Sequence, residues 1–341
     1  MSSAMQNSPD TRRVLALVLV SLVLIPLVWG CSRGQRFPAT APQTANVGDN
    51  IGWRTYLGDS ASSQYSTLDQ INRSNVGQLE VAWTYSSGGL REGQNTQIQC
   101  NPLIIDGVLF GSSADARFIF ALDAATGEEL WKFDTEGSGI SRGLTYWEND
   151  KRSERRLFYS ADDKLGALDP ETGQLIAAFG DNGKIDLHDN LGRDVSALQV
   201  LMRTPGAIYK DMLIVGSSLS EGPASAPGHV RAYDVRAGTL RWIFYTIPQA
   251  DEFGADTWPT GAHQRFGGAN AWSGITVDHE RGMVFLPTGS PAFDFWGGSR
   301  PGDNLFGNCL LALDADTGER IWHYQIVHHD LWDRDLPSET F

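Results

Sequence analysis

Cysteine is scarce in this chain, which contains three in 341 residues. Cys31, Cys100 and Cys309 are too widely separated for the paired spacing of a zinc site, and no Cys-x-x-Cys-His sequence is present to attach a haem. These two kinds of metal chemistry are therefore excluded within the sequence. Cys100 and Cys309 are compatible either with a disulfide in an oxidising compartment or with two separate buried thiols.

Basic residues are also few. Lys and Arg number 27 against 41 Asp and Glu, which leaves a formal net charge of −14. Because an acidic chain repels a phosphate backbone, nucleic acid is excluded as a partner. The sequence also lacks the nucleophile elbow of serine hydrolases, the P-loop and the dinucleotide fingerprint. We therefore expect neither nucleotide-based chemistry nor a hydrolase.

Long apolar runs are absent, with one exception near the N-terminus. Residues 14–28 are almost entirely apolar and follow Arg12-Arg13, but this run is short for a membrane-spanning helix. We predict that residues 1–31 direct export. Lipidation of Cys31, a retained membrane anchor and plain cleavage remain open, and the arginine pair faintly resembles a twin-arginine signal. Each outcome places the folded part in the periplasm or cell envelope, and the first two associate it with the membrane.

The remaining composition favours short strands joined by turns. The chain contains 37 Gly, 15 Pro and 11 Trp, and 41% of its residues are apolar, enough for a large core. Residues 32–50 are rich in Pro, Ala, Thr, Asn and Gly without periodicity, so we predict a flexible linker there. Residues 51–341 then form the folded domain.

A repeat runs through the folded domain. An apolar segment ending in Asp is followed by Thr-Gly or a variant of it, then by a second segment that in most copies carries Trp eight residues after the Asp. Residues 79–83 match the end of a degenerate earlier copy. The four complete copies are residues 119–131, 165–177, 230–242 and 310–322.

Each repeat has a physical reason. The Asp carboxylate accepts hydrogen bonds from the turn, Gly takes the positive φ that a tight hairpin needs, and the Trp is expected to fold back over that turn. Further pairs of apolar segments lie upstream, within 102–110, 206–215 and 275–286. A unit of four antiparallel strands is a β-propeller blade, so we predict an all-β propeller with about four to five blades in this chain. The repeated Asp, Gly and Trp are assigned to bracing the blades.

The repeats are unequally spaced, by 46, 65 and 80 residues. Insertions of this kind map to loops on one face of a propeller, often the binding face. They lie at 181–204, 217–228, 249–274 and 288–308. After the last repeat comes the acidic, histidine-containing segment 327–337, which is compatible with a general base, a cation site or a salt-bridged corner.

The repeats and the segment 327–337, with its sequence His-His-Asp-Leu-Trp-Asp-Arg-Asp-Leu-Pro, together resemble the quinoprotein dehydrogenases. The resemblance extends over 51–341 and favours the membrane glucose dehydrogenase branch, whose motif this segment matches almost letter for letter. It implies an eight-bladed propeller that is incomplete here, so we expect an N-terminal fragment of a longer protein.

The resemblance also implies an activity. Such an enzyme oxidises an aldose, polyol or other alcohol by hydride transfer to C5 of pyrroloquinoline quinone (PQQ), while Ca²⁺, or alternatively Mg²⁺ or a lanthanide, acts as the Lewis acid. Ubiquinone or a cytochrome accepts the electrons. A flat anionic quinone suits an aromatic floor, a hard cation with oxygen ligands, and cationic or hydroxyl donors.

Five residues match the family's contacts to the quinone. Trp272 is implied as the stacking floor, Arg142 as the guanidinium that pairs with quinone oxygens, and Thr204 and Ser218 as hydroxyl donors. Gln99 stands where methanol-type enzymes carry a glutamate. The plainer alternatives are a core tryptophan for Trp272 and a surface ion pair for Arg142. No adjacent cysteine pair precedes Arg142, which departs from the methanol branch.

Four residues match the catalytic base and the cation ligands. Asp333 is implied as the base and as a ligand, with Glu221, Ser290 and Asp335 as further ligands. Glu221 has the alternative of a solvated loop residue, and Ser290 replaces an asparagine, which is a departure that alters the coordination. Asp335 does not decide the metal, because both lanthanide-dependent and glucose enzymes carry an acid there. His328, His329 and Asp330 are assigned to supporting the site.

A non-enzymatic propeller lipoprotein of the outer-membrane assembly type is the alternative. It shares the repeats and the export signal, but has no need of Glu221, Trp272 and Asp333 in long insertions.

Overall fold

The computed structural model of the chain describes residues 52–89, 93, 97–138 and 141–338. The predicted export segment 1–31 and the predicted linker 32–50 lie outside the described residues. Across the ranges that are described, no helix has the length and apolar character needed to cross a bilayer.

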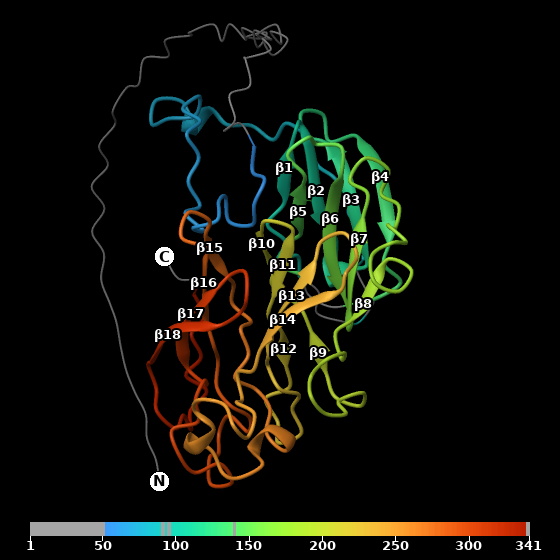
Figure 1. Cartoon of the computed structure of the whole chain (residues 1–341). Coiled ribbons are helices and arrows are strands. Elements are labelled where there is room, and N and C mark those ends of the chain that lie inside the picture. The colour runs from blue at the N-terminus through green and yellow to red at the C-terminus, as the bar shows by residue number, and fades with distance from the viewer. Residues whose placement is uncertain (1–51, 90–92, 94–96, 139–140, 339–341) are drawn as a thin grey trace, which may run out of the picture. The chain divides into compact units, whose positions relative to one another are not determined.

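Four antiparallel sheets of four strands each make up most of the described residues (Figure 1). The first consists of β1 (Leu103–Ile105), β2 (Val108–Ser112), β3 (Phe118–Asp123) and β4 (Glu129–Asp134). The second consists of β5 (Thr145–Glu148), β6 (Arg155–Ala161), β7 (Lys164–Leu168) and β8 (Lys184–Asp186). The third consists of β10 (Ala207–Tyr209), β11 (Met212–Val215), β13 (Val230–Asp234) and β14 (Leu240–Phe244). The fourth consists of β15 (Thr276–Asp278), β16 (Met283–Pro287), β17 (Cys309–Asp314) and β18 (Arg320–Gln325).

The other elements are short. A two-stranded ribbon pairs β9 (Val200–Leu201) with β12 (Ser218–Leu219). Single 3₁₀ turns are η1 (Val76–Gln78), η2 (Ala114–Ala116), η3 (Ala255–Thr257) and η4 (Ala262–Gln264). The prediction of an all-β chain of four-stranded blades is therefore confirmed.

The core lies in layers between successive sheets. Because neighbouring side chains of a strand point to opposite faces, Leu157 and Phe158 of β6 belong to different hydrophobic clusters, one shared with the first sheet and one with the third. Leu213 and Ile214 of β11 divide in the same way between the second and fourth sheets. The inner strand β10 contacts both β5 and β15. The sheets thus stack in chain order, and their connections meet around these inner strands.

The repeat turn forms as its residues predict. Asp123 Oδ1 accepts hydrogen bonds from the N–H groups of Ala125 (3.0 Å) and Thr126 (2.8 Å), and Gly127 takes a φ of 75°. The N–H of Gly127 donates to Asp123 O at 2.8 Å, which closes the turn. The assignment of these residues to a structural role follows from these bonds.

The repeated tryptophan does not fold over its own turn, and that prediction is wrong. A Cβ on Gly173 would lie 2.6 Å from the ring of Trp131, and one on Gly318 would lie 2.5 Å from the ring of Trp242. Each of these tryptophans therefore packs on the glycine of the following sheet's turn. The indole N–H of Trp242 also donates to Ala315 O at 3.1 Å. Each ring therefore joins two sheets instead of closing the hairpin of its own sheet.

The second repeat departs from the pattern. Its last strand is β8, ten residues beyond the turn, and Leu175 forms only an isolated bridge with Leu168. The sequence has Ala177 where the other copies have Trp. The turn of the third sheet therefore packs on main chain and not on an indole ring, since a Cβ on Gly238 would lie 2.7 Å from Gly180 N. The degenerate copy at 79–83 forms no strand, yet Trp83 packs on Gly127 as a repeat tryptophan does.

The two described cysteines are separate thiols. Cys309 is buried, and Cys100 is half-buried with its Sγ accepting a hydrogen bond from the N–H of Ser112 at 3.4 Å. Of the two possibilities left open by the sequence, the structure has the free thiols.

The packing of Trp242 between two sheets predicts a large effect on stability. Trp242→Ala is expected to lower the free energy of unfolding by about 3–5 kcal/mol, because it empties a buried site and leaves Ala315 O without its donor. Equilibrium denaturation of the purified chain measures this. Trp332→Ala, at a side chain that is 72% exposed, is the matched control and should change stability by no more than about 0.5 kcal/mol. Equal losses in the two variants would contradict the docking role.

Candidate cofactor and cation site

Side chains from several insertions meet at one cavity of about 460 Å³. The predicted residues that line it are Arg142, Ser218, Glu221, Trp272, Ser290, Asp333 and Asp335. They come from connections far apart in the sequence, as expected for the loop face of stacked sheets. The insertions therefore do converge on one place.

The backbone around Arg142 fixes one wall of this cavity. The N–H of Asn101 donates to Arg142 O at 2.7 Å, and the N–H of Arg142 donates to Arg203 O at 2.8 Å. These bonds join the segments that lead into β1, β5 and β10. Nearby, the ribbon of β9 and β12 places Ser218 opposite Leu201. The positions of Arg142 and Ser218 are thus set by main-chain hydrogen bonds.

Arg142 lies against the indole of Trp272. Its guanidinium carbon is 5.1 Å from the ring centroid, within the range of a cation–π contact. Its Nη1 donates to Thr204 Oγ1 at 2.9 Å and to Trp272 O at 3.3 Å, and Thr204 Oγ1 itself donates to Trp272 O at 2.6 Å. Thr204 therefore holds both residues in place although it is not among the cavity's lining residues.

The carboxylate of Asp335 orients Trp272. The indole N–H of Trp272 donates to Asp335 Oδ2 at 3.0 Å, and the N–H of Ser290 donates to Asp335 Oδ1 at 2.6 Å. A Cβ on Gly289 would lie 2.3 Å from Asp335 Oδ1, so glycine at that position is what lets the carboxylate approach the backbone. Both oxygens of Asp335 already accept a hydrogen bond from the protein.

Asp330 anchors the segment 327–337 to the fold. Only 2% of Asp330 is exposed, and it accepts hydrogen bonds from Ser290 Oγ, from Asn308 Nδ2 (3.3 Å) and from the N–H groups of Trp332 (3.0 Å) and Arg334 (2.6 Å). Burial alone would raise its pKa, but these hydrogen bonds together hold the pKa of Asp330 below its usual value. Its geometry suits the supporting role expected for it.

Two carboxyl oxygens remain buried without a hydrogen-bond partner among the described residues, namely Asp333 Oδ1 and Asp294 Oδ1. Asp294 is 5% exposed, and burial, then the negative charges of Asp333, Asp335 and Glu221, raises its pKa to about 8. Asp333 has a φ of 52°, an unusual conformation that Asp tolerates better than most residues. An acidic pocket with unpartnered oxygens and an aromatic wall fits a hard cation beside a flat anionic group.

Some predicted residues lie away from the cavity. Gln99 does not line it and precedes the main-chain bond made by Asn101. His328 is exposed, and His329 Nδ1 lies 2.9 Å from Gly302 O on the surface. Trp332, which lies between the acids in the sequence, is 72% exposed.

One residue that lines the cavity, Asp294, was not predicted from the sequence. Its position four residues after Ser290, in a long insertion, was the available signal.

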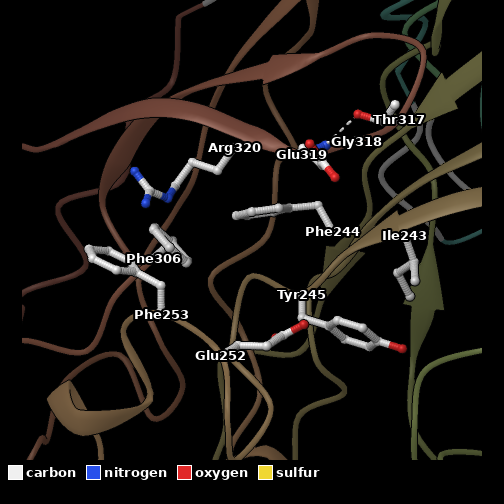
Figure 2. Close-up of a pocket in the computed structure, with 10 residues that line it drawn as sticks. All are labelled: Ile243, Phe244, Tyr245, Glu252, Phe253, Phe306, Thr317, Gly318, Glu319 and Arg320. Carbon is white, nitrogen blue, oxygen red and sulfur yellow. Dashed lines mark hydrogen bonds between the residues drawn. The ribbon is translucent and has the colours of Figure 1, made fainter.

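A second cavity, of about 340 Å³, lies between β14 and β18 (Figure 2). Its lining includes Phe244, Tyr245, Phe253 and Phe306, and Arg320 has its guanidinium carbon 4.1 Å from the ring centroid of Phe253. Figure 2 shows Arg320 beside Phe253 and Phe306, with Glu252 on another wall. None of the residues predicted for catalysis, cofactor or metal lines this cavity.

Another group of possible metal ligands is already paired with a lysine. Oxygens of Asp163 and Asp186 and a ring nitrogen of His188 lie within 4.8 Å of one another. Lys164 Nζ lies 2.6 Å from Asp186 and 3.4 Å from Asp163, so an ammonium supplies the positive charge. The His188 ring nitrogens lie 2.8 Å from Asp186 Oδ1 and 2.8 Å from Leu198 O. This network holds the insertion 181–204 that leads to Thr204.

The fold and the site together define a class: stacked four-stranded sheets whose insertions gather acids around an aromatic and an arginine. Comparison with known families agrees, since residues 53–341 match the family described as PQQ, glucose/ethanol/alcohol dehydrogenase, β-propeller domain. The chain belongs to this family of quinoprotein dehydrogenases.

Individual relatives show the same likeness. The chain is 32% identical to the quinate/shikimate dehydrogenase (quinone) of Acinetobacter baylyi, over 85% of this chain and 39% of that protein. It is 30% identical to quinoprotein glucose dehydrogenase A of Acinetobacter calcoaceticus, over 89% of this chain and 41% of the relative. Among solved structures, the quinohemoprotein alcohol dehydrogenase from Comamonas testosteroni superposes with a TM-score of 0.72 at 25% identity, covering 86% of this chain and 44% of that one. The chain thus spans well under half the length of these relatives.

The contacts of His188 predict a pH-dependent stability. Burial would lower the pKa of His188, but hydrogen bonds to Leu198 O and Asp186, with the nearby carboxylate of Asp163, raise it above its usual value. A raised pKa contributes stability that is complete below about pH 6.5, the unfolded value, and is lost as pH rises through the folded value.

We therefore expect the stability difference between the wild-type chain and His188→Gln to shrink as pH rises from about 6 towards 9. Thermal unfolding in a pH series measures it. His279→Gln, at an exposed histidine, is the control and should follow the wild type throughout. A constant difference between wild type and His188→Gln would show that the protonated ring does not stabilise the insertion.

Proposed function

We propose that this chain carries part of the active site of a PQQ-dependent dehydrogenase that oxidises a hydroxyl group of an aldose, polyol or other alcohol. The observation that carries the proposal is the buried, unpartnered Oδ1 of Asp333 in the same cavity as Trp272 and Arg142. Membership of the quinoprotein family and the relatives that act on glucose, glycerol and alcohols support this substrate class.

The residues have distinct roles in this proposal. Trp272 offers a flat face to the quinone, which Arg142 and Ser218 bind by donating hydrogen bonds to its oxygens, while Thr204 holds Trp272 and Arg142 in position. Gln99 is retained as a candidate contact at the edge of the site. The cation, Ca²⁺ or alternatively Mg²⁺ or a lanthanide, is assigned to Glu221, Ser290, Asp333 and Asp335.

The proton chemistry falls to Asp333. When bound, the quinone supplies a hydride acceptor and the cation supplies a Lewis acid. Asp333 Oδ1 accepts the proton of the substrate hydroxyl, because it is a carboxylate oxygen that no donor of the described residues occupies. Asp335 acts differently, since its oxygens already accept hydrogen bonds from Trp272 and Ser290. Ubiquinone or a cytochrome is the proposed electron acceptor.

We propose that the protein is located in the periplasm or cell envelope. Its N-terminal segment would attach it to the membrane, as an anchor or through a lipid. The basic pair Arg12-Arg13 before an apolar run supports it. Osmotic-shock and membrane fractionation of producing cells would test it, and a cytoplasmic pool of unprocessed protein would contradict it.

The alternative, a non-enzymatic propeller scaffold in the outer membrane, has little support from the site. A scaffold gains nothing from burying carboxylates together, because their mutual repulsion destabilises the fold. Catalysis of charge transfer, by contrast, needs such an arrangement.

A dye-reduction assay separates the two functions. The full-length protein is loaded with PQQ and Ca²⁺, and reduction of an artificial electron acceptor is followed with a panel of sugars, polyols and alcohols. A dehydrogenase reduces the dye with part of the panel and shifts the absorbance of PQQ on binding. The absence of both signals in the purified protein would favour the scaffold.

The assignment of the base predicts the phenotype of one variant. Asp333→Asn should reduce turnover by at least about 10²-fold, since it removes the proton acceptor, while PQQ binding measured by absorbance titration is retained. Asp303→Asn, at an exposed acid, is the control and should keep wild-type turnover. Retained turnover in Asp333→Asn would remove Asp333 from this role.

A further inference from the structure

Asp294 is a buried acid to which neither the sequence motifs nor the mechanism above assigns a role. It lies in the connection between β16 and β17, is 5% exposed and lines the acidic cavity. Its Oδ1 has no hydrogen-bond partner among the described residues. Leaving a buried carboxylate oxygen without a donor or a cation is costly, so its presence calls for a ligand.

Arg300 is a positively charged residue whose charge acts on Asp294, but it is not the hydrogen-bond partner of Asp294 Oδ1. Its Nη1 donates to Asn304 Oδ1 at 2.8 Å, and its Nη2 donates to the main-chain oxygens of Phe293 and Asp330. No ion pair joins Arg300 to Asp294 among the described residues. Within the described structure, the guanidinium therefore donates its hydrogen bonds to groups other than Asp294, although its positive charge partly offsets the rise in the pKa of that carboxyl group.

The position of Asp294 suits a ligand that bridges it to the other acids. Its N–H donates to Glu221 O at 3.4 Å, which places the two acids of different insertions side by side. Burial, and then the charges of Asp333, Asp335 and Glu221, raise the pKa of Asp294, while Arg300 lowers it. All four of these acids line the same cavity, and a bound cation there would offset their mutual repulsion.

The oxygens of the predicted ligands are unequally available. Ser290 Oγ donates to Asp330 and accepts from Asn308 Nδ2 at 3.1 Å, so its hydroxyl is engaged on the side of the protein. Asp294 and Asp333 are the acids of this cavity with buried, unpartnered oxygens in the described structure. Oxygen ligands that are negatively charged and unoccupied are the ones that a hard cation prefers.

Building on the proposed function, we propose that Asp294 is a direct ligand of the cation and takes the place assigned to Ser290 from the sequence. The cation is then held by Asp294, Asp333 and Glu221. Asp335 leaves the set of ligands assigned from the sequence, because both its oxygens accept hydrogen bonds, and it orients Trp272 instead. Ser290 and Asn308 keep Asp330, and through it the segment 327–337, in position.

Terbium luminescence tests this without any turnover. Tb³⁺ replaces Ca²⁺ at oxygen sites, and Trp272, whose Nε1 is 3.0 Å from Asp335, lies close enough to sensitise its emission. Tb³⁺ is titrated into the metal-free protein and then displaced with Ca²⁺. We expect Asp294→Asn to weaken Tb³⁺ binding by at least about tenfold and to reduce the increase in unfolding temperature caused by Ca²⁺.

Two matched variants complete the design. Ser290→Ala should weaken Tb³⁺ binding less than Asp294→Asn does, because it loosens the segment 327–337 without removing a ligand oxygen, and Asp303→Asn, an exposed acid of the same connection, should be unchanged. Metal-free Asp294→Asn should unfold close to the wild-type temperature, since burial and the neighbouring acids already favour the neutral carboxyl group that the amide resembles, so weak binding cannot reflect misfolding.

Each other outcome is informative. Wild-type affinity in Asp294→Asn, or a larger loss in Ser290→Ala than in Asp294→Asn, overturns the assignment of Asp294 while the dye-reduction assay still decides the proposed function. Absence of sensitised Tb³⁺ binding by the wild-type protein overturns the cation site itself.

Discussion

The packing of a tryptophan from one sheet on the turn glycine of the next is the contact on which the rest of the structure depends. Trp131 on Gly173 holds the first sheet against the second, and Trp242 on Gly318 holds the third against the fourth, while between the second and third sheets Gly238 packs on the backbone of Gly180. Each turn is held by its own Asp and Thr, so the ring meets a rigid surface. With the sheets in register, the insertions at their ends converge, and the cavity at Trp272 is a consequence of that convergence.

Within the cavity, the constraint is electrostatic. Four carboxyl groups share one cavity with the guanidinium groups of Arg142 and Arg203, and repulsion between like charges is stronger there than in bulk solvent. The protein neutralises only part of this charge. Asp330 is satisfied by donors from Ser290, Asn308 and the main chain, and Asp335 by Trp272 and Ser290. The remaining acids are left for a ligand, and their position beside an indole and a guanidinium determines what kind of ligand fits.

Much of the fold could be predicted because its signals are local. The Asp-x-x-Thr-Gly turn is encoded within five residues, and the alternation of apolar residues follows from the geometry of a strand. The partner of each tryptophan could not be predicted, because it lies in another repeat, and neither could the shift of β8, where Ala177 removes the ring that would have packed. Sequence patterns indicate which units form but contain little about how two units contact each other.

The same distinction explains the site. The motif around Asp333 is contiguous and could be read from the sequence, whereas the significance of Asp294 depends on Glu221, Asp333 and Asp335 lying near it in space. Ser290 occupies the position of a family ligand, yet its hydroxyl is engaged by Asp330 and Asn308. Aligned position alone therefore does not identify a ligand. A carboxylate whose oxygens accept several hydrogen bonds positions its neighbours, as Asp330 and Asp335 do. A carboxylate with a buried oxygen that accepts no hydrogen bond is available to bind a cation or a proton. In the described structure, Asp294 and Asp333 have such an oxygen and the acids near them do not.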